Sequence, residues 1–148
     1  MQFYSQPLVE HNEVPLADEG RYEEILQYFD RWQAAAAKYH EGQNRCYVIS
    51  VGNWTDNSIR DAALNEMVSL VQAQGDQIVG QESIRLKRVL PRTYIGHGVA
   101  QAIADRAGEL GADLLVLDAE LSPSQLRNLE DAAGMAVCDR EAVILNVF

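Results

Sequence analysis

The chain has 148 residues, of which 12 are basic and 22 acidic, and its formal net charge is −10. This length suits one domain with a single core, since typical domains have about 100–150 residues. No run of about 18 apolar residues occurs, which excludes a membrane-spanning helix. The acidic charge also excludes a protein that coats nucleic acid with its whole surface, because that needs many Lys and Arg residues.

The N-terminus has neither a cationic start nor a long apolar stretch, so we expect a cytoplasmic protein with no signal peptide and no membrane contact. Cys46 and Cys138 lie within apolar runs and are expected to be reduced, buried thiols. The three histidines are scattered, and no CxxC or HxxxH spacing is present. We therefore expect no metal site.

Residues 1–44 are rich in aromatic side chains and predict an N-terminal helical extension. Its main helix is expected over residues 19–38, with Tyr22, Ile25, Leu26 and Phe29 on one stripe. This stripe either packs on the rest of the protein or docks another chain, such as a second copy or a protein partner.

Residues 45–148 form the second predicted unit, which begins with a strand over residues 46–51. A helix is then expected to start at Ser58, because Ser58 and Asp61 have the spacing of a capping box. Gly75 should end this helix, and Ile78 and Val79 should form the next strand. The expected core face of the helix comprises Ile59, Ala62, Ala63, Met67, Leu70 and Val71.

The helix–glycine–strand pattern then occurs twice more. One helix follows Gly98 and ends at Gly111, before a fully apolar strand over residues 114–117; its expected core face comprises Val99, Ala102, Ile103, Ala107 and Leu110. In the other, Ser122 is the N-cap, Pro123 takes the first helical position, Gln125 completes a capping box, and Leu121 and Leu126 form a hydrophobic staple. Leu126, Leu129 and Ala133 should face the core, Gly134 should cap the helix, and residues 135–138 should form the last strand.

This alternation predicts an α/β fold. Continuous apolar strands between helices indicate a parallel open sheet of about four strands, with helices on both faces and right-handed crossovers. The N-terminal helical extension precedes this sheet.

In such sheets, ligands bind beyond the carboxyl ends of the strands. The loop after the first strand leads into a helix N-terminus, which favours an anion, but every fold of this class has such a loop, and a plain connecting loop is the simpler interpretation. The candidate crevice comprises Asn53, Thr55, Asp56, Asn57, Ser58 and the strand-end residues Asp118 and Asp139. No GxxxxGK[ST] sequence and no nucleophile–base pair occur, so no catalytic residue is proposed.

The one dense basic segment holds four of the twelve cations, namely Arg85, Lys87, Arg88 and Arg92. These side chains are suited to contact phosphates of a nucleic acid. Alternatively, they protect an exposed edge strand by their charge. The turn formed by Gly96, His97 and Gly98 follows, where the backbone could approach a phosphate or simply connect a strand to a helix.

Five segments occur in a fixed order along the chain: the turn at residues 93–98, residues 109–113, the stretch from Leu121 to Glu130, Asp139-Arg140 and Ile144-Leu145. Together these segments resemble the N-terminal domain of the HflX family of translation-associated GTPases. The most specific is the stretch from Leu121 to Glu130, whose motif residues are Ser122, Pro123, Gln125, Arg127, Asn128 and Glu130.

The resemblance implies a non-catalytic domain that contacts the large ribosomal subunit and its RNA and regulates an adjoining GTPase domain. GTP and Mg²⁺ belong to that later domain, so no cofactor is expected for this chain. Two departures from the family are His97 and Val99, which stand where family members carry lysines. Alternatives are a short paralogue that acts as a protein-interaction module, and a nucleotide-binding domain that uses the crevice.

Overall fold

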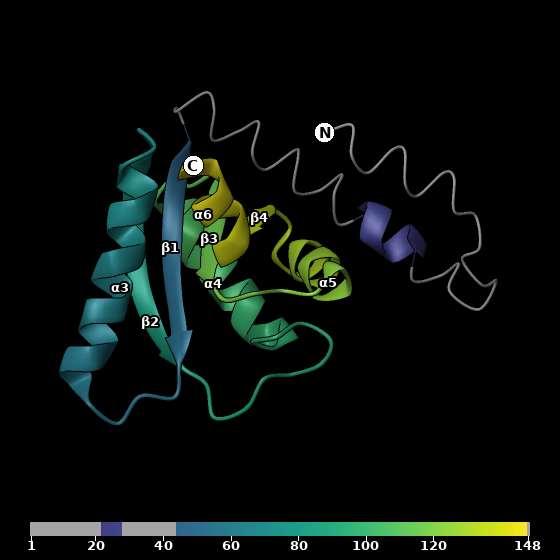
Figure 1. Ribbon diagram of the computed structural model, residues 1–148, viewed down its shortest axis with the longest axis horizontal. Helices are drawn as coiled ribbons and strands as arrows, with labels where there is room; N and C mark the ends of the chain where they lie inside the picture. Colours follow the sequence, from purple (N-terminus) through teal and green to yellow (C-terminus); the bar gives the residue numbers. More distant parts are fainter. Residues whose placement is uncertain (1–21, 28–43, 148) are drawn as a thin grey trace.

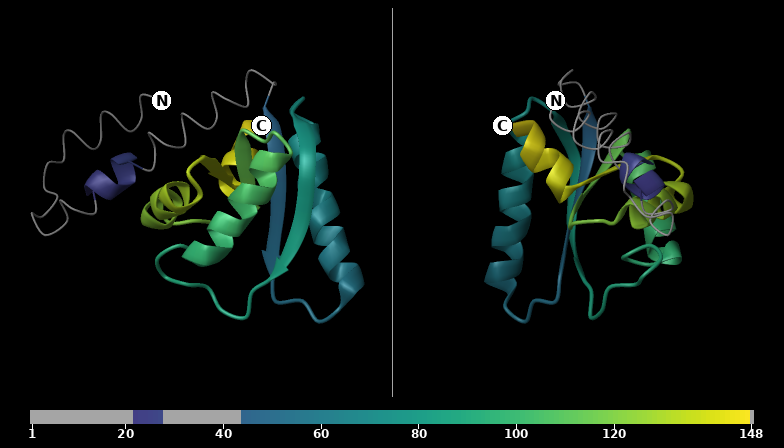
Figure 2. Two further views of the ribbon diagram at one scale, coloured as in Figure 1. Left: turned by 180° about the vertical axis from the view of Figure 1, so that it is seen from behind. Right: turned by 45° about the vertical axis from the view of Figure 1, so that its right-hand side comes forward.

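In a computed structural model of the protein, which describes residues 22–27 and 44–147, a parallel sheet is covered by helices on both faces (Figure 1). Helices α3 and α6 lie on one face, and α4 and α5 on the other (Figure 2). Along the chain the elements are β1 (Arg45–Gly52), α3 (Asn57–Gln72), β2 (Gln77–Arg85), α4 (His97–Glu109), β3 (Leu114–Asp118), α5 (Pro123–Ala133), β4 (Ala136–Asp139) and α6 (Arg140–Val147).

The four strands have the order β2-β1-β3-β4, and every pair is parallel. The chain moves outward from β1 to β2, and then returns across β1 to β3 and β4. This reversal places the topological switch point between β1 and β3. The predicted α/β class is confirmed. Residues 22–27 are helical, and the remainder of the predicted N-terminal extension lies outside the described residues.

The sheet divides the core into two apolar clusters. Successive residues of a strand point to opposite faces, so Cys46 and Val48 pack toward α3 and α6, whereas Tyr47 and Ile49 pack toward α4 and α5. Strand β3 is buried on both faces, with each residue of 114–117 less than 5% exposed. Burying each large aliphatic side chain contributes about 1.5–3 kcal/mol, so β3 anchors both clusters.

Strand β2 is much longer than the predicted Ile78–Val79 pair, and it forms one edge of the sheet. Its register against β1 shifts between Cys46, which pairs with Ile78, and Tyr47, which pairs with Gly80. Val79 is therefore an extra residue in β2, which makes a β-bulge. The polar residues of β2 concealed its full length in the sequence, because an edge strand needs fewer apolar side chains than a central strand does.

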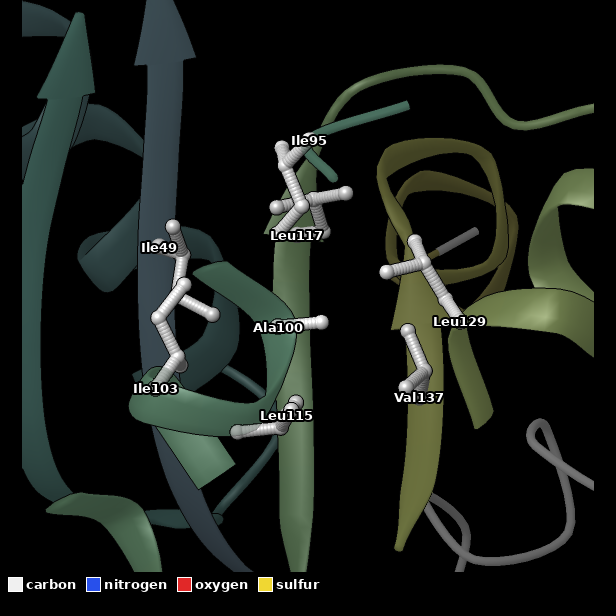
Figure 3. Close-up of a pocket in the computed structure, with 8 residues that line it drawn as sticks. All are labelled: Ile49, Ile95, Ala100, Ile103, Leu115, Leu117, Leu129 and Val137. Atoms are coloured by element: carbon white, nitrogen blue, oxygen red, sulfur yellow. The ribbon is translucent and has the colours of Figure 1, made fainter. Parts of the chain in front are cut away.

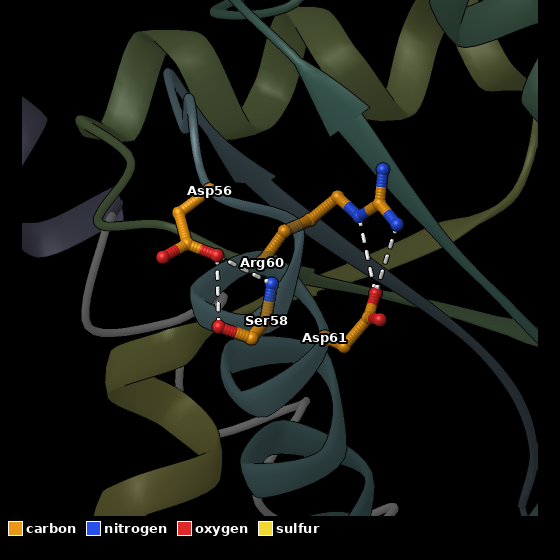
Figure 4. A network of polar contacts seen from close by, with 4 residues as sticks. All are labelled: Asp56, Ser58, Arg60 and Asp61. Carbon is orange, nitrogen blue, oxygen red and sulfur yellow. Dashed lines mark hydrogen bonds and ion pairs between the residues drawn. The ribbon is translucent and has the colours of Figure 1, made fainter.

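The predicted start of α3 is wrong. Asp56 is the N-cap, and its carboxylate accepts hydrogen bonds from Ser58 N at 2.8 Å and from Ser58 Oγ at 2.8 Å (Figure 4). These bonds, led by the one from the hydroxyl, lower the pKa of Asp56. Asp61 does not complete a capping box, since it pairs with the neighbouring Arg60 at 3.1 Å. The helix thus begins one residue earlier, at Asn57.

The predicted core faces of two helices are too wide. In α3 the buried residues are Met67 and Val71, whereas Ile59 is 59% exposed. Eight residues separate Ile59 from Met67, a rotation of about 80° beyond two full turns, which carries Ile59 off the buried stripe. In α4 the sheet is contacted by Ala100, Ile103 and Ala107, while Val99 and Leu110 are exposed.

The start and the end of α5 agree with the prediction. Ser122 Oγ accepts from Gln125 N at 3.1 Å, and Gln125 Oε1 accepts from Ser122 N at 3.0 Å, which completes the capping box. Leu121 and Leu126 are both buried, as a hydrophobic staple requires, and Gly134 ends the helix with φ +70°. Of the expected core residues Leu126 and Leu129 are buried, but Ala132 is buried in place of Ala133, which is only half-buried.

Helix α6 was not predicted, because it follows β4 without an intervening loop and has no glycine or proline at its start. Cys46 and Cys138 are buried thiols outside any disulfide, as expected. Burial is the main cause that raises the pKa of the Cys46 thiol. Among the described helices, none combines the length and the apolar character needed to cross a membrane.

Candidate functional site

Two loops leave the carboxyl ends of β1 and β2 at the same edge of the sheet (Figure 1). Residues 53–56 connect β1 to α3, and residues 86–96 connect β2 to α4. Leu86 N donates to Gly52 O at 2.9 Å, and Arg85 Nε donates to Asn53 Oδ1 at 3.1 Å. The structure therefore brings together one residue of the predicted crevice and one of the basic segment.

The basic segment spans the end of an edge strand and the loop after it. Arg85 is the last residue of β2, and the other three cations lie in the loop. All four are exposed, and none forms an ion pair with the described residues: Arg85, Lys87, Arg88 and Arg92. Three other arginines each face a carboxylate, namely Arg60, Arg106 and Arg140. The segment is thus a local positive charge that nearby acids leave uncompensated.

The loop that carries these cations is closed by its own backbone. Leu90 and Tyr94 form an antiparallel bridge in which each N–H donates to the carbonyl of the other at 2.9 Å. Tyr94 has φ +67°, a left-handed conformation that costs energy for an aromatic residue. Thr93 is buried, and its Oγ1 accepts from Gly96 N at 3.1 Å. The backbone between Leu90 and Gly96 is therefore tightly constrained.

Helix α5 fixes the same loop from outside. Gln125 Nε2 donates to Leu90 O at 3.2 Å, and Asn128 Nδ2 donates to Arg92 O at 3.0 Å. The two side chains lie three residues apart, on one face of the helix. Gln125 and Asn128 belong to the motif of residues 121–130. These two side chains therefore act as clamps on the basic loop, our name for the segment of residues 85–92.

The remaining motif residues also make structural contacts. Ser122 and Pro123 start α5, as described above. Glu130 Oε2 accepts from Val137 N at 3.1 Å and so ties α5 to β4. Arg127 Nη1 donates to Gln27 Oε1 at 2.7 Å and holds the short helix of residues 22–27 against α5. The motif residues thus connect α5 to three neighbouring segments, namely the basic loop, β4 and the helix of residues 22–27.

The glycine turn is a strand-to-helix connection. Gly96 is the N-cap of α4 with φ +98°, and no side chain caps the helix. His97 and Gly98 are exposed and already belong to the first turn of α4. The turn lies directly after the basic loop, so the loop and the start of α4 form one continuous surface.

Several of the predicted crevice residues take part in local structural contacts. Asp56 and Ser58 are engaged in capping α3, and Asn57 is its first residue. Thr55 is exposed in the loop before them.

The strand-end aspartates are engaged in local contacts. Asp118 Oδ1 pairs with Arg140 Nη1 at 2.5 Å. Asp139 is buried, and its two oxygens accept from Ala142 N at 3.0 Å and Leu121 N at 3.3 Å. Burial raises the pKa of Asp139, and the two backbone bonds oppose that change. These aspartates hold α6 and the loop before α5 in place.

An apolar cavity of about 10 Å³ lies between the sheet and helices α4 and α5 (Figure 3). Its lining includes Ile49, Leu117 and Leu129 and has no polar side chain. A water molecule needs at least this volume and two or more polar partners. The cavity is a small packing gap in the core and has no features of a ligand site.

Trp54 is the residue of this edge that the sequence analysis did not single out. A Cβ atom added at Gly52 would lie 2.5 Å from Cε2, 2.6 Å from Cζ2 and 2.9 Å from Nε1 of Trp54. Three adjacent ring atoms at such similar distances show that the face of the indole covers Gly52. Trp54 is half-buried and belongs to neither core cluster. The available signal was a large aromatic residue two positions after the end of β1, beside the polar Asn53.

Comparison with known proteins identifies the family. The chain is 38% identical over 108 residues to the GTPase HflX of Lacrimispora saccharolytica, which covers 73% of this chain and 25% of that protein. It is 30% identical over 120 residues to the GTPase HflX of Escherichia coli, covering 81% of this chain and 26% of that protein. The chain thus spans about a quarter of the length of these relatives.

A solved structure shares the fold. It is a GTP-binding protein from the hyperthermophilic archaeon Sulfolobus solfataricus, with a TM-score of 0.52 and 16% identity over 70% of this chain and 30% of that one. The family model described as GTP-binding GTPase N-terminal matches residues 61–148, which include the basic loop and both clamps. The chain therefore belongs to the GTP-binding GTPase N-terminal family, the family of the N-terminal domain of HflX GTPases.

Proposed function

We propose that this domain binds RNA of the large ribosomal subunit through the basic loop, meaning the segment with Arg85, Lys87, Arg88 and Arg92. The observation that carries the proposal is that these four clustered, exposed cations lack acidic partners in the described structure, whereas Arg60, Arg106 and Arg140 are paired. Phosphates of a nucleic acid would supply the missing negative charges. Ribosome contact implies that the protein works in the cytoplasm.

The clamps from α5 support this proposal. A flexible loop would lose conformational entropy when it binds, at a cost of about 0.5–1.5 kcal/mol for each side chain that becomes ordered. Gln125 and Asn128 fix the backbone at Leu90 and Arg92 before any partner arrives. The net charge of −10 repels phosphate elsewhere on the surface, so contact should be confined to this loop.

We further propose that RNA contact by this domain regulates a GTPase domain in the intact protein. The chain has no GxxxxGK[ST] sequence, and the relatives named GTPase match it over only about a quarter of their own length. In this proposal the domain recognises the ribosome, and the catalytic steps belong to another part of the protein.

Cosedimentation with purified large subunits tests the RNA contact. The triple variant K87A/R88A/R92A should bind more weakly, and its plot of log affinity against log salt should be flatter by about one for each lost phosphate contact. The matched control is R60A, which removes a cation on α3. Equal binding of the triple variant and the wild type would contradict the proposal.

A protein-interaction role is the second candidate, and residues 22–27 favour it. Gln27 and Glu24 of this helix bond to Arg127 and Ser124 of α5. Its apolar side chains remain 40–45% exposed, namely Tyr22, Ile25 and Leu26. The variant I25S/L26S should dissociate a dimer or partner complex in size-exclusion chromatography, if the helix is an interface. An unchanged monomer in both proteins would remove this candidate.

A further inference from the structure

Trp54 lies on the same face of the sheet as Arg85. Gly52 and Arg85 are register partners in neighbouring parallel strands, so their Cβ directions point to the same side. The indole covers Gly52 on that side, toward α3. The aromatic ring and the Arg85 side chain therefore lie on the same side of the sheet, at its carboxyl end.

The indole is poorly explained by packing alone. Tryptophan carries the largest apolar side chain, and it normally dominates a core or an interface. Trp54 joins neither apolar cluster of the described structure. One face rests on Gly52, and no hydrogen bond to its Nε1–H is formed within the described residues. Trp54 is half-buried, so part of its ring remains accessible to solvent at the rim of the sheet.

The guanidinium group of Arg85 has one side-chain partner among the described residues, Asn53. Its Nε donates to Asn53 Oδ1 at 3.1 Å, which fixes the plane of the guanidinium group. The terminal nitrogens form no ion pair with the described residues, and the side chain is exposed. Asn53 is consequently a positioning residue, and the two Nη groups can bind a phosphate in a bidentate manner.

From this arrangement we propose that Trp54 stacks on an unpaired nucleobase of the bound RNA while Arg85 holds a neighbouring phosphate. The inference rests on the proposed RNA binding and specifies its target as a single-stranded loop or bulge. Bases within a duplex are already stacked on each other, whereas an unpaired base offers its face to an aromatic side chain. The combination of an aromatic platform with adjacent cations is typical of single-strand recognition.

The test compares a short single-stranded oligoribonucleotide, end-labelled with a fluorophore, with a perfect duplex of the same sequence. Fluorescence anisotropy of the label reports binding anywhere on the protein. We expect W54L to weaken single-strand binding by roughly 5- to 150-fold, the range found when a stacking aromatic is removed. W54F should retain most of the affinity because it retains a ring, and R85A should weaken binding of the same oligonucleotide.

Intrinsic fluorescence provides a second readout. The chain has two tryptophans, so W32F leaves Trp54 as the sole indole. Its emission should be quenched by the single strand with the same midpoint as the anisotropy, and less by the duplex. Circular dichroism of W54F and W54L checks that both variants are folded.

The outcomes separate the two proposals. Binding that depends on Lys87, Arg88 and Arg92 but is unchanged in W54L, or that leaves Trp54 emission unaltered, would overturn the stacking inference and retain RNA binding. Stronger binding of the duplex than of the single strand would also overturn the stacking inference and retain RNA binding. Absence of binding to either RNA would overturn both proposals.

Discussion

The side-chain amide of Asn128 in α5 donates a hydrogen bond of 3.0 Å to the main-chain carbonyl of Arg92, 36 residues earlier in the sequence. Gln125 makes the corresponding bond to Leu90. Two side chains of α5 thus fix the backbone of the basic loop, although this loop lies far earlier in the sequence.

Replacing Asn128 by alanine should loosen the basic loop. The loss of one hydrogen bond should reduce the free energy of unfolding by about 0.5–1.5 kcal/mol. Amide hydrogen exchange should become faster for residues 86–96, and RNA affinity should fall, although no cation is removed. N128Q, which retains the amide group on a longer stem, is the matched comparison. Unchanged exchange in N128A would show that the bond does not restrain the loop.

Removing the N-cap of α5 should destabilise the domain. Ser122→Ala loses the hydroxyl that accepts from Gln125 N, at a cost of about 0.5–2 kcal/mol. For a domain of this size, 1 kcal/mol lowers the melting temperature by about 4 °C. Thermal unfolding followed by circular dichroism measures the change. Ser69→Ala, at an exposed position inside α3, is the control and should melt like the wild type.

Gly52→Ala should destabilise the domain through contact with Trp54. The added Cβ would lie 2.5 Å from the indole, so the ring must move, at a cost of about 1–3 kcal/mol. The double variant G52A/W54L should recover part of this loss, and chemical denaturation of all four proteins measures the coupling. Gly108→Ala, in α4, is the control. Its Cβ would meet nothing within 4 Å, and alanine favours a helix by about 1 kcal/mol over glycine. Additive effects of G52A and W54L would show that the two residues do not interact.

Stability should depend on pH through Asp139. Burial raises the pKa of this carboxyl in the folded state, so the folded protein holds the proton to a higher pH than the unfolded chain does. Its contribution to the free energy of unfolding should therefore decrease as pH rises from about 4 through the raised folded value. Asp139→Asn cannot titrate, so wild-type stability minus variant stability should fall across this window. Urea unfolding at several pH values measures it, and a constant difference would refute the expectation.

Cys46 and Cys138 should not react with a thiol reagent while the protein is folded. Both are at most 2% exposed, and burial raises the pKa of Cys46, which disfavours the reactive thiolate. Labelling followed by mass spectrometry should reach both thiols only in denaturant. Rapid labelling under native conditions would indicate local opening of β1 or β4.

Local chemistry explains which elements the sequence predicted well. The cap of α5 is encoded within four residues, Ser122 to Gln125, so it needed no knowledge of the fold. The start of α3 was harder, because Asp56, Asn57 and Ser58 are three consecutive residues that can each cap a helix. Strand order, the bulge in β2 and the buried stripe of α3 depend on tertiary packing, which one sequence does not reveal.

For the candidate site too, the residues could be predicted from the sequence, whereas their contacts depend on tertiary packing. A cluster of four cations is visible in the sequence, and so is the motif that contains Gln125 and Asn128. The connection between them is not, because 35 and 36 residues separate the bonded groups. Trp54 was not predicted for a related reason, since its proposed role depends on the pairing of Gly52 with Arg85 in neighbouring strands.

The bulge at Val79 bears on how copies of this domain behave in concentrated solution. Among residues 44–147, β2 is an edge strand of nine residues, and such an edge offers N–H and C=O groups on which another strand can assemble. An extra residue bends and twists that edge, so a second straight strand finds fewer groups in register. The bulge therefore protects the domain against edge-to-edge aggregation.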